Sequence, residues 1–243
     1  TERVEADLAL GVATGTETGR DILQGVENLT GGSGDDVLSG DGESNVLSGG
    51  VGDDVLAGRG GSDTLVGGEG TDTVSFADET TTVSANLSTG RAEGVGSGSD
   101  TLSGIESVIG GSGDDVLTGD TSDNMLAGGS GDDAIDGGLG DDDLSGGDGD
   151  DVITGAEGAD AIDGGAGADV AVFAGDQSEY TFTSSEDGLT ITVTESATGD
   201  ADTVTAIETL RFDDGDVLVS QDANGLVLTG SAGADTLTIV GDV

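Results

Sequence analysis

The sequence predicts an all-β fold, a solenoid whose short parallel strands stack into two sheets, and three observations support this class. A nine-residue pattern recurs in register, with glycine at its first position and an apolar residue at its eighth. A longer pattern also recurs, so that Val4 and the residues after it match Val83 and its successors. No segment shows the 3.6-residue period of an amphipathic helix, so we expect very little helix.

The first element is a lead-in segment that precedes each array of nine-residue units. Its two parts and their copies are Val4–Leu8 with Val83–Leu87, and Asp21–Asn28 with Asp100–Ser107 and Asp202–Thr209. In the copy at residues 83–87, apolar and polar residues alternate, which is typical of a half-buried strand. We therefore expect strands in the lead-in and interpret it as a recurring element that opens each array.

The nine-residue units follow in two arrays, over residues 31–75 and 110–172. Position 6 of the successive units is Asp36, Asn45, Asp54, Asp63 and Asp72, then Asp115, Asn124, Asp133, Asp142, Asp151, Asp160 and Asp169. Glycines at positions 1, 2 and 4 permit a tight turn, and positions 7 to 9 can form a short strand whose middle residue points inward. One turn and one strand reverse the chain, so two units complete one coil.

The rest of the chain differs in composition. The runs Tyr180–Phe182 and Leu189–Val193 alternate about Glu186–Gly188, which predicts a β-hairpin with the aromatic residues as its local core. The predicted parts of the chain are residues 1–82, a lead-in and the first array; 83–172, a lead-in and the second array; 173–225, a small antiparallel β-element; and 226–243, the start of a further repeat.

Composition excludes several classes of function. Lys and Arg number 5 against 51 Asp and Glu, a formal net charge of -46, which would repel nucleic acid and anionic lipid surfaces. Histidine and cysteine are absent, so there is no disulfide, thiolate metal site or imidazole base. No apolar run approaches the roughly 18 residues that span a bilayer, and the first ten residues contain no secretory signal. We expect no nucleic-acid partner, no membrane insertion and no enzymatic activity.

Stacking of the coils predicts a cation site. Each unit would stack on the next unit but one at the parallel-strand spacing of about 4.8 Å, which brings position-6 carboxylates together beside outward carbonyls. Unpaired, these charges repel one another. A hard divalent cation held by six or more oxygens at about 2.3–2.6 Å removes the repulsion, and such a site suits calcium better than magnesium.

The pattern G-G-x-G-x-D-x-U-x resembles the hemolysin-type calcium-binding (RTX) repeat, in which such units form a parallel β-roll. The resemblance implies that calcium ions lie between position-6 side chains of stacked units. The eight implied pairs are Asp36–Asp54, Asp54–Asp72, Asn45–Asp63, Asp115–Asp133, Asn124–Asp142, Asp133–Asp151, Asp142–Asp160 and Asp151–Asp169. Carbonyls of the glycine turns would complete each shell, at Gly32, Gly34, Gly50, Gly52, Gly111, Gly113, Gly129, Gly131, Gly138, Gly140, Gly147 and Gly149.

The resemblance also implies a function. It indicates a calcium-dependent structural segment of a larger extracellular protein, exported by type I secretion, that acts as a scaffold or spacer. The alternative is a binding or self-assembly module at the cell surface, acting through calcium-bridged polysaccharide or through association in a surface layer or adhesin. We expect incomplete occupancy at Asn45 and Asn124, and we expect position-5 acids such as Asp53 and Asp150 to face water.

Overall fold

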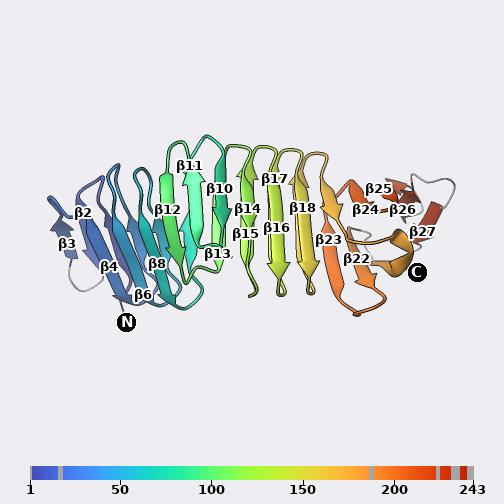
Figure 1. The fold of residues 1–243 in the computed structure, drawn as a ribbon, viewed down its shortest axis with the longest axis horizontal. Coiled ribbons are helices and arrows are strands. Elements are labelled where there is room, and N and C mark those ends of the chain that lie inside the picture. Colours follow the sequence, from blue (N-terminus) through green and yellow to red (C-terminus); the bar gives the residue numbers. More distant parts are fainter. Residues whose placement is uncertain (1, 16–18, 186–188, 223–224, 231–235, 240–243) are drawn as a thin grey trace. The chain divides into compact units, whose positions relative to one another are not determined.

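The computed structural model describes residues 2–15, 19–185, 189–222, 225–230 and 236–239, and in these ranges the protein is all-β (Figure 1). The one helical turn within them is a 3₁₀ turn at Gln177–Glu179. No helix in the described part of the chain has the length and apolar character needed to cross a membrane. The chain divides into two compact units, residues 1–118 and 119–243, which we describe separately.

Unit 1 contains two β-sheets, and successive strands of its array alternate between them. The strands are β1 (Val4–Asp7), β2 (Val12–Gly15), β3 (Gly19–Ile22), β4 (Asn28–Ser33), β5 (Val37–Ser39), β6 (Val46–Val51), β7 (Val55–Ala57), β8 (Thr64–Glu69), β9 (Thr73–Ser75), β10 (Val83–Asn86), β11 (Arg91–Gly94), β12 (Gly98–Ser103), β13 (Ser107–Gly111) and β14 (Val116–Thr118). Within this unit one sheet has the order β13-β9-β7-β5-β1-β2-β3 and the other β14-β10-β11-β12-β8-β6-β4. In the array, strands two units apart pair in parallel, which confirms the predicted coil.

Unit 2 also contains two sheets. Its strands are β15 (Met125–Ser130), β16 (Ala134–Leu139), β17 (Asp143–Asp148), β18 (Val152–Glu157), β19 (Ala161–Ala166), β20 (Val170–Val172), β21 (Tyr180–Ser184), β22 (Thr190–Glu195), β23 (Ala201–Thr205), β24 (Thr209–Phe212), β25 (Gly215–Asp222), β26 (Gly225–Gly230) and β27 (Thr236–Ile239). One sheet runs β15-β17-β19-β23-β22-β21 and the other β16-β18-β20-β24-β25-β26-β27. The parallel coils therefore pass into antiparallel strands after β19 and β20.

The core of each array is a column of aliphatic side chains from position 8. In unit 1, Leu38 lies beside Leu56 in neighbouring parallel strands, and in unit 2 Leu144 lies beside Ile162. The position-8 residues, each at most 2% exposed, are Leu38, Leu47, Leu56, Leu65, Val74, Leu117, Leu126, Ile135, Leu144, Ile153, Ile162 and Ala171. Because side chains alternate along a strand, the residues at positions 7 and 9 lie on the outer face. Each sheet thus contributes a single layer of aliphatic side chains to the core.

The lead-in closes the preceding array as well as opening the next one. β10, β11 and β12 form an antiparallel meander. β10 pairs in parallel with β14 of the following array, whereas β12 pairs in parallel with β8 of the preceding one. β13 pairs with β9 in the same manner. The lead-in therefore closes one array and opens the next, and unit 1, which ends at residue 118, includes the lead-in at residues 83–109.

The C-terminal part of unit 2 is antiparallel. β21 pairs with β22 as the predicted hairpin requires, and its turn at residues 186–188 lies outside the described residues. In the other sheet, β24, β25, β26 and β27 pair antiparallel in sequence order. The further repeat predicted to start within residues 226–243 falls partly on positions 231–235 and 240–243, which lie outside the described residues.

Candidate metal centre

The position-6 side chains of each array stack into rows that we call acid ladders. All of them are at most 4% exposed. The backbone N–H of one rung donates to Oδ1 of the rung eighteen residues later, as from Asp36 to Asp54 at 2.7 Å and from Asp54 to Asp72 at 2.8 Å. The other bonds of this kind, at 2.8–2.9 Å, run from Asn45 to Asp63, Asn124 to Asp142, Asp133 to Asp151, Asp142 to Asp160 and Asp151 to Asp169.

The structure thus places seven of the eight predicted pairs side by side. The eighth pair, Asp115 and Asp133, has one member in each compact unit. Asp115 lies at the start of its ladder, where Oδ1 accepts the N–H of Val83 in β10 at 2.8 Å. In the same way, Oδ1 of Asp36 accepts the N–H of Val4 in β1. The lead-in therefore supplies the donor that precedes the first rung.

The second carboxylate oxygen of most rungs is buried without a donor. In the described structure, Oδ2 has no hydrogen-bond partner in Asp36, Asp54, Asp63, Asp72, Asp142, Asp151, Asp160 and Asp169. A buried ionised carboxylate that lacks a compensating partner is unfavourable by several kcal/mol. A cation that binds these oxygens offsets this penalty, so the residues present fit a site for hard cations.

Position-1 glycines leave the space beside this oxygen. A Cβ built on Gly49 would lie 2.0 Å from Oδ2 of Asp54. A Cβ built on Gly31 would lie 2.1 Å from Oδ2 of Asp36 and 2.6 Å from the carbonyl oxygen of Gly49 in the next coil. Oxygens from two consecutive coils therefore converge on the space that a side chain would fill. Gly31 and Gly49 are not in the left-handed region, so packing explains these glycines.

The turns add columns of backbone carbonyls. Gly50 has φ +118°, and a Cβ built on it would lie 2.4 Å from the carbonyl oxygen of Gly32 in the coil below. Of the predicted ligand glycines, those with φ between +102° and +143° are Gly32, Gly34, Gly50, Gly52, Gly129, Gly131, Gly138, Gly140, Gly147 and Gly149. Gly111 and Gly113 do not share this conformation. The stacked carbonyls are ligands of the type that calcium prefers.

Position-5 acids form a second ladder that is exposed and runs in the opposite direction. Oδ1 of Asp53 accepts the N–H of Thr71, eighteen residues later, at 2.9 Å. The same bond is accepted by Asp35, Asp123, Asp132, Asp141 and Asp150. Asp53 and Asp150 face water, as predicted. These acids also connect neighbouring coils, a role that the sequence pattern did not reveal.

The two asparagines are the first rungs of their ladders. Oδ1 of Asn45 accepts the N–H of Asp41 at 2.9 Å, within its own unit, and Asn124 accepts the N–H of Asp120 at 2.7 Å. Eighteen residues before each asparagine lies a lead-in glutamate in place of a rung. A neutral amide at this point removes one buried charge from the end of the ladder, which accounts for the departure from the repeat pattern.

The ladders end at carboxylates outside the repeat, which we call the closing acids. Asp63 donates its backbone N–H to Oδ1 of Asp100, and Asp72 donates to Oε2 of Glu106, both at 2.9 Å. In unit 2 the same bonds run from Asp160 to Asp202 and from Asp169 to Glu208, both at 2.9 Å. Sequence analysis missed all four closing acids because insertions shift them out of the nine-residue register. The signal that could have found them is the Asp and Glu shared by the three lead-in copies.

Burial raises the pKa of several ladder carboxyls and of two closing acids. Loss of hydration, with a smaller contribution from neighbouring carboxylates, raises the pKa of Asp100 and Asp202 to about 7 and that of Asp142 to about 6. Loss of hydration is also the main cause of a raised pKa in Asp54, Asp63, Asp72, Asp151, Asp160 and Asp169. A raised folded-state pKa stabilises the cation-free fold at low pH, and this contribution is lost as pH rises from 3.8 toward 7. At neutral pH the ladders therefore need another source of positive charge.

The oxygen ligands of this site suit calcium. No group of three or more Asp, Glu, His or Cys side chains gathers at one point in the described ranges, so carbonyl oxygens must complete each coordination shell. Calcium accepts 6–8 mixed carboxylate and carbonyl oxygens in flexible geometry. Magnesium requires a compact octahedron and gives up its water reluctantly. The ladders and turn carbonyls therefore favour calcium.

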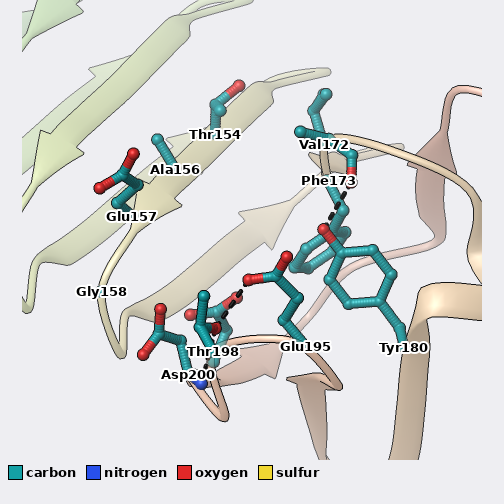
Figure 2. Close-up of a pocket in the computed structure, with 12 residues that line it drawn as sticks. Thr154, Ala156, Glu157, Gly158, Val172, Phe173, Tyr180, Glu195, Thr198 and Asp200 are labelled. Carbon is teal, nitrogen blue, oxygen red and sulfur yellow. Dashed lines mark hydrogen bonds between the residues drawn. The ribbon is translucent and has the colours of Figure 1, made fainter.

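Unit 2 also contains a hollow of about 450 Å³ beside its aromatic residues (Figure 2). Phe173 stacks on Phe212 with 5.4 Å between ring centroids, and Tyr180 lies 5.1 Å from Phe212. The Tyr180 hydroxyl donates to the carbonyl oxygen of Ala174. The acidic residues that line the hollow are Glu157, Glu195, Asp200 and Asp202. Because the rings contact one another, we assign them to the local core of the antiparallel element.

Comparison with solved structures finds similarity to the extracellular lipase LipA from Serratia marcescens. The match has 19% sequence identity and a TM-score of 0.30, and it covers 76% of this chain and 39% of the lipase chain. This chain therefore corresponds to well under two thirds of the lipase. No curated protein matches the chain.

Comparison with protein families identifies the repeat itself. The RTX calcium-binding nonapeptide repeat matches residues 21–56, 39–74, 95–135, 109–144 and 136–171, which together make up more than half of the chain. These ranges contain every rung of the acid ladders and the closing acids of unit 1. Such repeats bind calcium, in agreement with the buried carboxylates and stacked turn carbonyls of both units. The chain belongs to the RTX calcium-binding nonapeptide repeat family.

Proposed function

We propose that the chain folds when calcium fills its acid ladders and then serves as a scaffold or spacer in a larger extracellular protein. The observation that supports this function is the row of buried carboxylates whose Oδ2 atoms lack a donor, as at Asp54 and Asp151. Each nine-residue unit buries one aliphatic side chain fully, which is too little to offset the entropy lost by ordering nine residues. Cation binding supplies the missing stabilisation.

We assign one calcium ion to each of the seven predicted pairs that lie within one compact unit, and we extend the assignment to the ends of the ladders. There the closing acids, Asp100 and Glu106 in unit 1 and Asp202 and Glu208 in unit 2, take the place of a further rung. The ion would neutralise the carboxylates, while the chain itself supplies the oxygens and excludes water from the core. We assign no catalytic role to the chain. Export by type I secretion follows from its family and belongs to the same proposal.

Circular dichroism during a calcium titration tests this function. In EGTA we expect a largely disordered chain, which gains β-structure cooperatively near 10⁻⁴–10⁻³ M calcium, the range of extracellular calcium modules. Magnesium at the same concentrations serves as the control and should restore little β-structure. A full β-signal that persists in excess EGTA would contradict calcium-coupled folding.

A further inference from the structure

The lead-in element occurs three times, and in two copies it covers the end of an array. Each copy contains an Asp followed six residues later by a Glu: Asp21 and Glu27, Asp100 and Glu106, Asp202 and Glu208. Only the second and third pairs are closing acids in the described structure. The same element is therefore seen in two environments within one chain.

In the covered copies, the element exchanges two hydrogen bonds with a rung, one through its Asp side chain and one through its backbone. Oδ1 of Asp100 accepts the N–H of Asp63 at 2.9 Å, and the N–H of Thr101 donates back to the carbonyl oxygen of Asp63 at 2.9 Å. The copy at residues 202–209 makes the same exchange with Asp160. Three apolar residues at matching positions are buried beneath the last coil. They are Leu102, Ile105 and Val108 in one copy and Val204, Ile207 and Leu210 in the other, each at most 6% exposed.

The first copy has the same backbone but no coil upon it. β1, β2 and β3 form a meander whose register matches that of β10, β11 and β12 residue for residue. β3 and β4 are the outermost strands of the two sheets of unit 1, at the blue end in Figure 1. All residues of β3 are exposed, as are Asp21 and Glu27. The apolar residues that match the buried triads, Leu23, Val26 and Leu29, are only half-buried.

We propose that the face formed by β3 and β4 is a docking surface for one coil of two nonapeptide units. The occupant would add one parallel strand to each sheet, as β8 and β9 do on β12 and β13. Its two position-6 N–H groups would donate to Asp21 and Glu27, and its position-8 side chains would cover the half-buried apolar residues. This goes beyond the proposed calcium-coupled folding, because it names what the exposed face binds.

The two lead-in copies that are covered by a coil show which kind of segment fits the face formed by β3 and β4. An ordinary edge strand can pair with one added strand of its own sheet. The face formed by β3 and β4 instead offers hydrogen-bond acceptors for one added strand in each of the two sheets. A nonapeptide coil carries matching donors at the required separation, because its last two rungs have no later rung to receive their N–H groups. The net charge of -46 makes an acidic partner unfavourable unless its carboxylates also take up cations.

An extended chain tests the proposal. A second copy of residues 31–79 is placed directly before Thr1, which reproduces the natural join between residues 79 and 80 because the pattern repeats from Val4 to Val83. In saturating calcium, hydrogen exchange at the amides of residues 21–29 should slow by about tenfold or more relative to the original chain. The double variant Asp21→Ala, Glu27→Ala should remove this gain in the extended chain.

The same double variant in the original chain is the control. There Asp21 and Glu27 are exposed, so its calcium midpoint and its circular dichroism should stay unchanged. Unchanged exchange at residues 21–29 on extension would overturn the docking proposal, and so would an equal effect of the double variant in both chains. Failure of calcium-coupled folding would show separately, as a calcium-independent β-signal in the original chain.

Discussion

Most aspartate rungs of the acid ladders use their two carboxylate oxygens for different purposes. Oδ1 of Asp54 accepts the backbone N–H of Asp36, a bond that fixes the distance between two coils. Oδ2 of the same residue is buried without a donor beside the bare Cα of Gly49. The first oxygen can be replaced by any acceptor of similar size, whereas the second requires a cation. The two contributions can therefore be separated by substitution.

Asp54→Asn should retain the coil contact and lose the calcium contact. Its amide oxygen can still accept from Asp36, but the charge shared by the pairs with Asp36 and Asp72 is gone. Loss of one charge at a calcium site costs more than about 1.4 kcal/mol, so the calcium midpoint should rise about tenfold or more. The matched control is Asp53→Asn, one residue earlier on the exposed ladder, which should move the midpoint little. Circular dichroism titrations measure both, and equal midpoints would contradict the ligand assignment.

Gly49→Ala should destabilise the fold through packing alone. A Cβ at this position would lie 2.0 Å from Oδ2 of Asp54, so the carboxylate or the coil must shift, at a cost of about 1–3 kcal/mol. Gly42→Ala is the control, because a Cβ on Gly42 meets nothing within 4 Å. Urea unfolding in saturating calcium gives both free energies. A Gly49 variant as stable as the Gly42 variant would show that the space beside Oδ2 is not needed.

At the scale of the element, the lead-in performs two tasks at once. Its meander receives the preceding array through β12 and offers β10 to the following one. The closing acids stop the ladder because they accept from the last rungs and then depart from the repeat. The element thus sets where an array ends.

The double variant Asp100→Ala, Glu106→Ala should uncover the end of the first array. The N–H groups of Asp63 and Asp72 lose their acceptors, and each buried donor left without one costs about 1–3 kcal/mol. We expect a higher calcium midpoint and faster hydrogen exchange at these two amides. Glu93→Ala, an exposed acid in β11 of the same meander, is the control and should leave both unchanged. Normal protection of both amides in the double variant would contradict the closing role.

The array could be predicted from the sequence because its period determines its pairing. A nine-residue unit with one inward side chain places Leu38 beside Leu56, and the structure confirms this register. The closing role of Asp100 and Asp202 could not be predicted in this way. Their partners lie 37 and 42 residues away, so no fixed period connects them. The orientation of position-5 acids toward the next coil also depends on the turn geometry, which the pattern does not specify.

At the scale of the whole molecule, stability is distributed over many equivalent contacts between neighbouring coils. Each coil contacts mainly the coils before and after it, so the stability of a unit is a sum of similar neighbour terms. The antiparallel strands after β19 and β20 bring the aromatic residues and a broader core to one end of unit 2. Loss of that end should therefore weaken the array next to it.

Truncation after residue 172 tests this dependence. The shortened chain lacks Asp202 and Glu208, which accept from Asp160 and Asp169. We expect fast hydrogen exchange at these two amides and a higher calcium midpoint for unit 2, with unit 1 unaffected. A chain that ends at residue 222 retains both closing acids and should resemble the full chain. Identical behaviour of the two truncations would show that the closing strands do not stabilise the array.

The donor and acceptor ends of an acid ladder also bear on aggregation. A bare stack of coils would show carboxylate oxygens at one end and N–H groups at the other, two surfaces that complement each other. Copies of such a stack could join head to tail without closure, which is the geometry of fibres. In this chain Val4 occupies the first acceptor and the closing acids occupy the last donors. The lead-in that follows an array therefore protects the donor end of that array and sets its length, whereas Asp21 and Glu27 of the first lead-in stay exposed to a further coil.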